Sequence, residues 1–142
     1  MYVRAITEED LPALYELCAA ASGTAMPQQL FAGVLRAVLS DKRRRVVIAF
    51  EGERAVGYGD LQVELLLSSC TFAGLLQELY VEEAMRGKNI GTGMLIALSG
   101  QAKTLGCTEM RANTSRVNLK AQSFLERHGF VKTQHLFSKP LK

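Results

Sequence analysis

Residues 76–95 constrain the fold most, because an apolar strand pattern there runs into a basic, glycine-rich loop and then into an apolar helix. Strand-forming residues such as Tyr80 and Val81 end the first part, and Met94 and Leu95 open the helix. A loop of this kind leaves backbone N–H groups free, and the helix N-terminus adds about half a positive charge. The stretch therefore predicts a site for a polyanion such as a pyrophosphate.

Three phosphate-binding loops compete to explain this stretch. The nucleotide P-loop, G-x-x-x-x-G-K-S/T, has no match in the chain. The dinucleotide fingerprint, G-x-G-x-x-G, begins at Gly91-Thr92-Gly93, but Ile96 occupies its third glycine position and no earlier βαβ unit is evident. The third loop, Q/R-x-x-G-x-G/A, binds acyl-CoA in the GNAT acetyltransferases, and residues 86–91 resemble it.

One position departs from the acyl-CoA loop, since Asn89 stands where most GNAT members have glycine. Among non-glycine residues, asparagine is one of those that best tolerate left-handed backbone angles, so the departure is mild. A glycine-rich turn that binds no ligand is the remaining interpretation of the loop taken alone.

The pattern of elements predicts a mixed α/β fold with a largely antiparallel sheet flanked by helices. Strands are expected at residues 2–6, 45–50, 55–67, 72–81, 108–114 and 130–139. Helices are expected from residue 7 to about 22, from residue 27 onward, at 90–105 and at 118–127. The order is β-α-α-β-β-β-α-β-α-β, and no linker or repeat interrupts it. Residues 1–142 are therefore expected to form one domain.

Composition and charge narrow the class of protein. The chain is 48% apolar and 22% charged, typical of a soluble globular protein, and no apolar run approaches the ~18 residues of a membrane span. The N-terminus shows no signal-peptide pattern, and Cys18, Cys70 and Cys107 lack C-x-x-C spacing. We expect a cytoplasmic protein with no disulfide, no metal site and cysteines buried in the core. The basic run at residues 42–45 is short and lacks aromatic residues, so we expect a solvated turn, with no nucleic-acid or membrane partner.

The C-terminal third carries a second motif. Residues 113–130 resemble the GNAT pattern N-x-x-A-x-x-F/L-Y-x-x-x-G-F/Y, and the matching residues are Asn118, Ala121, Phe124, Gly129 and Phe130. The element order is also the GNAT order, so the resemblance spans the whole chain. Residues 74–139 look most like the aminoalkylphosphonate N-acetyltransferases, which share Q-E-L-x-V at 77–81, R-G-x-N-V/I-G at 86–91 and, extending just past this range, F-x-K-x-L at 137–141.

The resemblance implies transfer of an acetyl group from acetyl-CoA to a primary amine of a small molecule, by direct attack in a ternary complex. It assigns the cofactor site to Leu79, Tyr80, Val81, Arg86, Gly87, Lys88, Asn89, Ile90, Gly91, Thr92 and Asn118. The loop residues in this set are expected to bind the pyrophosphate, and the strand residues to lie beside the amide-rich pantetheine arm. Asn118 matches the family asparagine that contacts the same arm. A homodimer is a possible assembly, since dimers are common in the family.

The reaction needs a base, because the amine arrives as an ammonium ion at pH 7 and must lose a proton before it attacks. Glu78 is the expected catalytic residue, since it lies on the strand beside the thioester and matches the family's position. A charged residue inside an apolar strand needs a partner, so a salt bridge from Glu78 to Arg111 or Arg116 is the alternative interpretation. Glu64 or a chain of water molecules are the other candidate bases.

The family's usual tyrosine, which protonates the leaving thiolate, corresponds to Leu125 here. Solvent, Tyr80 or Ser123 is then left to supply the proton, and the loss of a general acid costs roughly 10²–10⁴-fold in rate. The same position leaves a non-catalytic acyl-CoA-binding module open. A protein or peptide N-acetyltransferase, which needs an open groove for a peptide, is a further alternative. Residues 20–31, between the first two helices, are expected to shape the acceptor pocket.

The two histidines lie in the last fifth of the chain. His128 is expected in the final turn of a helix, where a partly positive side chain suits the dipole, and a structural role is favoured. His135 is expected on the last strand, where facing the substrate is the minor alternative.

Overall fold

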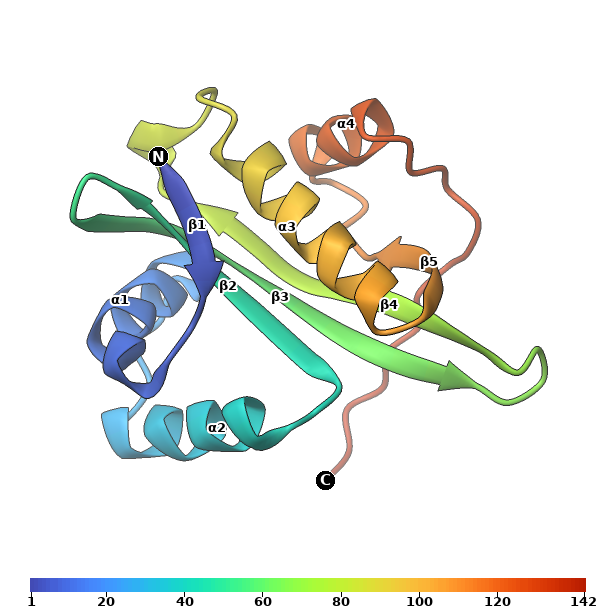
Figure 1. Cartoon of the computed structure of the whole chain (residues 1–142), viewed down its shortest axis with the longest axis horizontal. Coiled ribbons are helices and arrows are strands. Elements are labelled where there is room, and N and C mark those ends of the chain that lie inside the picture. The colour runs from blue at the N-terminus through green and yellow to red at the C-terminus, as the bar shows by residue number, and fades with distance from the viewer.

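The computed structural model describes residues 1–142 and contains one five-stranded sheet with helices on both faces (Figure 1). The strands are β1 (Tyr2–Ala5), β2 (Arg44–Glu51), β3 (Arg54–Leu66), β4 (Thr71–Val81) and β5 (Cys107–Ala112). The helices are α1 (Leu11–Ser22), α2 (Gln28–Ser40), α3 (Ile90–Thr104) and α4 (Leu119–Arg127), with short 3-10 turns η1 (Glu8–Asp10) and η2 (Glu83–Met85). Strands β1 to β4 are antiparallel in sequential order, and β5 lies parallel to β4. The predicted mixed α/β class is confirmed.

Two cores form because successive side chains of a strand point to opposite faces of the sheet. On β2, Ile48 and Phe50 pack with α1 and α2, whereas Val47 and Ala49 pack with α3. The first core includes Leu14, Leu17, Leu35 and Tyr58, and the second includes Leu61, Ile90, Met94 and Leu98. The face to which a β4 side chain points therefore decides which helices it meets.

Asp10 ties β1 to the start of α1. Arg4 donates two hydrogen bonds to this carboxylate, each 2.8 Å long, and the backbone N–H of Thr7 donates a third, also 2.8 Å. The hydrogen bonds from Arg4 hold the pKa of Asp10 below its ordinary value, against the opposing effect of burial. An ion pair and a backbone hydrogen bond thus hold the 3-10 turn η1, which leads into α1, against β1.

A β-bulge interrupts the pairing of β3 and β4 at the middle of the sheet. Asp60 lies opposite Glu78, but the next residue, Leu61, lies opposite Leu76, so Gln77 is the extra residue on β4. On its other side β4 pairs with β5 only from Phe72 to Leu76. The end of β4, residues 77–81, therefore has a strand partner on one side only.

The predicted last strand at residues 130–139 is wrong, because no helix or strand follows α4. Leu136 and Phe137 are adjacent, so a strand would send them to opposite faces and neither face would be apolar. Both are more than 70% exposed, as are Val131 and Leu141. The outer edge of β5, where a further strand would pair, stays unpaired.

Two smaller expectations also change. Cys70 is exposed at the β3–β4 turn with a left-handed φ of 55°, whereas Cys18 and Cys107 pack against the two cores as predicted. Of the basic run, Arg44 and Arg45 belong to β2 rather than to a solvated turn. None of the helices is both long and apolar enough to cross a membrane.

Candidate active site

The loop between β4 and α3 presents a row of unused backbone donors. Gly87 and Asn89 both adopt left-handed angles, with φ of 81° and 65°, so the expectation that asparagine tolerates this geometry agrees with the structure. The backbone N–H groups of residues 87–92 donate to no group of the protein, and the first bond of the helix runs from Gly93 to the Asn89 carbonyl. The loop and the start of α3 therefore offer consecutive donors at the positive end of a helix dipole.

Arg86 joins this loop to the end of β4. Its Nε atom donates to the Val81 carbonyl at 2.9 Å, and its guanidinium carbon lies 5.7 Å from the centroid of the Tyr80 ring. Lys88 is exposed, and its Nζ lies 3.9 Å from the Met85 sulfur. Both cations are thus at the loop, and Arg86 also has an anchoring contact that its residue type alone does not reveal.

At the end of β4, the main-chain groups of two residues point to the open side of the strand, where no neighbouring strand pairs with it. The Glu82 N–H donates to the Val56 carbonyl, so Val81 and Gly57 form a pair that exchanges no hydrogen bonds. In such a pair the N–H and C=O groups point away from the neighbouring strand. Leu79, two residues earlier in the same register, is oriented in the same way. The intervening Tyr80 uses its main chain for the ladder with β3, so only its side chain is free for other contacts.

Glu78 lies on the α1 and α2 face of the sheet and is solvent-exposed. The buried Tyr58 hydroxyl donates to Glu78 Oε1 at 2.6 Å. Burial, followed by this hydrogen bond, raises the pKa of Tyr58 well above its usual range. The predicted alternative of a salt bridge to Arg111 or Arg116 is wrong, because Arg111 pairs with Glu109 at 3.2 Å and Arg116 forms no ion pair. The partner of Glu78 is instead Tyr58 on β3.

Asp60 is a neighbour of Glu78 that the sequence analysis did not name. It lies opposite Glu78 in the β3–β4 register, is 7% exposed, and accepts a hydrogen bond of 3.0 Å from Arg44 Nε as well as one from the guanidinium NH2 group. A charged residue in the apolar run of β3 was the available signal. Glu64, the alternative base, lies opposite Ala73, about five residues or ~16 Å along β4 from Glu78. It is therefore not part of this group.

Helix α4 packs against the start of α3. A Cβ atom on Gly91 would lie 3.4 Å from the Phe124 ring, which leaves little room for a side chain there. His128 joins the two helices, with Nε2 3.0 Å from the Thr92 hydroxyl and Nδ1 2.7 Å from the Phe124 carbonyl. Leu125 packs against the core on the α3 side. These contacts support the structural role expected of His128, whereas His135 forms no hydrogen bond.

Asn118 caps α4, since its Oδ1 accepts from the Ala121 N–H at 3.1 Å. The amide nitrogen of Asn118 has no partner and remains available for a ligand.

The connection between α1 and α2 is also held in place, because the Tyr15 hydroxyl donates to the Met26 carbonyl and the Tyr15 ring meets Phe31 edge-on at 5.4 Å.

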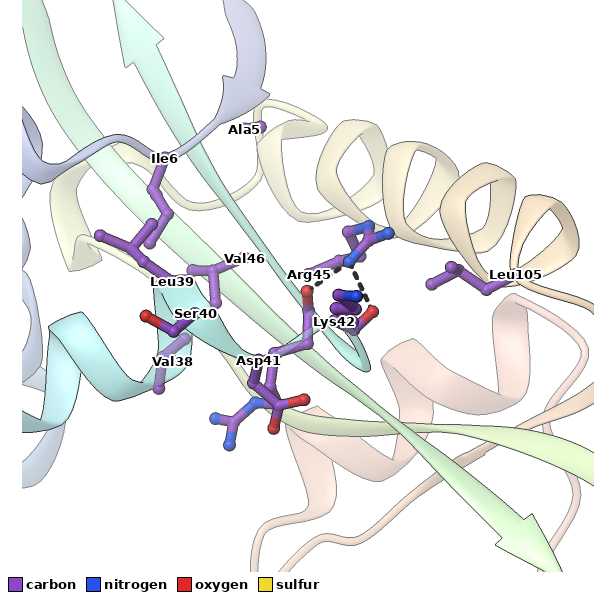
Figure 2. A pocket seen from close by; sticks show the side chains of 11 residues that line it. Ala5, Ile6, Val38, Leu39, Ser40, Asp41, Lys42, Arg45, Val46 and Leu105 are labelled. Atoms are coloured by element: carbon purple, nitrogen blue, oxygen red, sulfur yellow. Dashed lines mark hydrogen bonds between the residues drawn. The ribbon is translucent and has the colours of Figure 1, made fainter.

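A cavity of about 530 Å³ lies elsewhere, where α2 leads into β2 (Figure 2). Its lining includes Val38 and Leu39 from α2, Arg45 from β2 and Leu105 beyond α3. The Arg45 guanidinium folds back onto the carbonyls of Lys42 and Arg44, at 3.0 and 2.8 Å. None of the predicted site residues lines this cavity.

Comparison with known proteins identifies relatives over the whole chain. The profile of the acetyltransferase (GNAT) family matches residues 4–130. An aminoalkylphosphonate N-acetyltransferase from Salmonella typhimurium is 28% identical over 141 residues, which cover 98% of this chain and 90% of that protein. Two solved structures share the fold: a transcriptional regulator from Bacillus halodurans (TM-score 0.89, 20% identity, 99% of both chains) and the aminoglycoside N-acetyltransferase AAC(6′)-Iy in complex with CoA (TM-score 0.89, 18% identity, 99% of this chain and 94% of that one).

Proposed function

We propose that this chain, which belongs to the acetyltransferase (GNAT) family, transfers the acetyl group of acetyl-CoA to a primary amine of a small molecule. Its membership makes it an acetyl-CoA-dependent N-acetyltransferase. The proposal adds the class of acceptor, the direct attack within a ternary complex and the residues that carry out each step. The relative from S. typhimurium is named for an aminoalkylphosphonate, a small molecule with an amino group, which supports the acceptor class.

The free backbone donors of residues 87–92 are the observation that carries the proposal. A pyrophosphate needs several N–H donors and a positive field, and the start of α3 supplies both. Arg86 and Lys88 add cationic charge on the same loop. The chemistry of this donor set fits the diphosphate of CoA.

The open side of β4 fits the rest of the cosubstrate. The pantetheine arm contains two amides, and an amide chain placed beside a strand is satisfied by that strand's main chain. Leu79 and Val81 turn their main-chain groups to this side, although the Val81 carbonyl already accepts from Arg86. The free amide nitrogen of Asn118 is a further donor that we assign to the same arm.

Glu78 is the residue that we assign as general base. Acetyl-CoA supplies the acetyl group as a reactive thioester. Glu78 takes a proton from the ammonium form of the acceptor, directly or through a water molecule, so that the amine lone pair is free to attack. Its exposed carboxylate lies one residue from Leu79, whose main chain borders the proposed pantetheine path.

Direct attack is favoured because no cysteine of the chain suits an acyl-enzyme. Burial raises the pKa of both the Cys18 and the Cys107 thiols, so neither is an activated thiolate. Cys70 lies at the exposed β3–β4 turn, far along the hairpin from Glu78. Ser123 borders a shallow outer surface with Lys120 and Arg127, which leaves solvent and Tyr80 as proton donors to the departing thiolate.

Incubation of the purified chain with acetyl-CoA and a panel of amines, followed by mass spectrometry, tests the proposal. The panel contains aminoalkylphosphonates, polyamines, aminoglycosides and a peptide with a free N-terminus. We expect a mass increase of one acetyl group on at least one small amine, and no such product with Glu78→Gln. Acetylation of the peptide alone would contradict the acceptor class, and measurable CoA binding without any product would favour a non-catalytic module.

We further propose that residues 1–142 act as one domain and that this domain forms a homodimer. One continuous sheet, with helices packed on both faces, supports the first statement. The unpaired outer edge of β5 and the exposed Leu136, Phe137 and Leu141 support the second, because a free strand edge and exposed apolar groups each favour association. Analytical ultracentrifugation of the full chain at micromolar concentration should give a dimer mass, and a monomer mass would contradict it.

A further inference from the structure

We infer that Tyr58 is a positioning residue for the proposed general base, because its buried hydroxyl holds the Glu78 carboxylate in one orientation. The inference rests on the proposed function, in which Glu78 removes a proton from the acceptor amine. It extends that function by naming the group that prepares Glu78 for this step.

The hydrogen bond between these two residues has the geometry of a charge-assisted contact. Tyr58 Oη and Glu78 Oε1 are 2.6 Å apart, within the short range typical of a hydroxyl donating to a carboxylate. An ionised carboxylate accepts only, so the hydroxyl is the donor. The raised pKa of Tyr58 means that the phenol keeps its proton at every working pH. Glu78 thus receives a permanent donor on one oxygen.

Packing holds the donor in one orientation. Tyr58 is 3% exposed, and its ring belongs to the core cluster that contains Leu14, Leu17 and Ile48. The ring of Tyr80 lies 6.1 Å away on the neighbouring strand. The buried phenol is hydrogen-bonded to the exposed carboxylate and fixes its Oε1 atom. The other carboxylate oxygen accepts no hydrogen bond from the protein, so an amine or a water molecule can approach it.

No cation touches Glu78 from the elements packed around it. From β3, Asp60 faces Glu78, but Arg44 of β2 pairs with Asp60 and offsets its charge. From α1, the Cys18 thiol interacts with the Tyr58 hydroxyl, and burial raises the pKa of this thiol and keeps it neutral.

On β4 itself, Tyr80 points to the same face as Glu78, and Arg86 is held over the Tyr80 ring and against the Val81 carbonyl. Tyr58 is consequently the one group of the chain that donates a hydrogen bond to Glu78. Without this donor the exposed carboxylate is free to rotate among its rotamers. Removal of the Tyr58 hydroxyl should therefore lower the fraction of time in which the base faces the acceptor amine, and with it kcat.

The test is the separate measurement of kcat and KM with the acceptor amine and with acetyl-CoA in the wild type, Tyr58→Phe and Glu78→Gln. In Tyr58→Phe we expect kcat to fall about tenfold, which is the effect of losing one hydrogen bond to a charged group where water replaces part of it. The KM for acetyl-CoA should stay within about twofold of the wild type. Tyr2→Phe, which alters a half-exposed tyrosine stacked on Phe50, is the matched control and should leave kcat unchanged.

A purely structural role for Tyr58 would lower stability, or raise the KM for acetyl-CoA, without a selective loss of kcat in the folded variant, and that result overturns the inference. If Tyr58→Phe does not fold, incorporation of 3-fluorotyrosine at position 58 keeps the donor with little change in shape, and kcat should then stay within about twofold of the wild type. A tenfold fall in kcat there also overturns the inference. If Glu78→Gln keeps full activity, the proposed base and this inference both fail, whereas an inactive Glu78→Gln with an unchanged kcat in Tyr58→Phe refutes the inference alone.

Discussion

Charge reversal at Arg86 should weaken CoA binding by more than tenfold. Arg86→Glu changes the local charge by two units beside a diphosphate that carries about two negative charges. At a separation of about 6 Å, Coulomb's law in water gives about 2.8 kcal/mol, and screening with a Debye length of about 8 Å reduces this to about 1.3 kcal/mol. That energy corresponds to about a tenfold change in Kd. Loss of the Nε contact to Val81, which anchors the loop, adds to the effect.

Isothermal titration calorimetry with CoA measures the change directly. Arg86→Gln removes one charge instead of two, so its loss of affinity should be about threefold from charge alone. The matched control is Lys103→Glu, an equal charge reversal near the other end of α3 and about 20 Å from Ile90 along the helix axis. Since two Debye lengths separate it from the loop, CoA affinity should change less than about twofold.

Salt dependence supplies a second check on the same reasoning. At about 0.5 M NaCl the Debye length falls to about 4 Å, so the difference in Kd between the wild type and Arg86→Glu should shrink. An Arg86→Glu affinity within twofold of the wild type, in a variant whose thermal unfolding shows that it is folded, would refute the assignment of this loop. An equal loss of affinity in Lys103→Glu would refute the local electrostatic explanation.

Three further changes have defined outcomes. Leu125→Tyr should fold and stay active in a CoA-release assay. Complete loss of activity with intact CoA binding would count against placing residue 125 near the sulfur atom of CoA. Asp10→Asn should lower the free energy of unfolding in urea by about 1–2 kcal/mol at pH 7 through its contact with Arg4. Because the folded pKa of Asp10 is depressed from its ordinary 3.8, this contribution is complete above about pH 5 and is lost as the pH falls through the lowered value, so the difference in stability between the two proteins should shrink as the pH falls below 3.8. Gly57→Ala should cost about 2–3 kcal/mol, since the new Cβ would lie 2.6 Å from a backbone oxygen of β4, whereas Gly33→Ala in α2 meets no atom within 4 Å and should stabilise by up to about 1 kcal/mol.

Local patterns predicted most of the elements. The strand, loop and helix at residues 76–95 appear where expected, and Asn89 has the left-handed angles that its residue type tolerates. These features depend on neighbours along the chain, such as apolar spacing, turn residues and free amides at a helix start. The strand expected at residues 130–139 failed for the opposite reason, because strand formation there needs an apolar face that matches a partner edge, and Leu136 and Phe137 cannot share one face.

The residues of the candidate site also fall into two groups, those that the sequence could suggest and those that only the structure brings together. Glu78 and the loop residues could be proposed from sequence, because motif spacing places them next to one another on one strand and one turn. The alternative interpretation, a salt bridge from Glu78 to Arg111 or Arg116, was wrong. Arg111 lies opposite Leu75 in the β4–β5 register and pairs with Glu109, and Arg116 lies beyond the end of β5. The contact with Tyr58 joins residues 20 positions apart.

The sequence by itself therefore determined the strand–loop–helix junction at which we propose a polyanion site, and it placed a carboxylate one residue before Leu79 on the strand. Only the tertiary structure decided which groups surround that carboxylate. Strand register brought Asp60 opposite Glu78, and the same pairing placed Tyr58 within 2.6 Å of it. Register is set by which residues the whole sheet can bury against α1 and α3, and no short stretch of sequence contains that information.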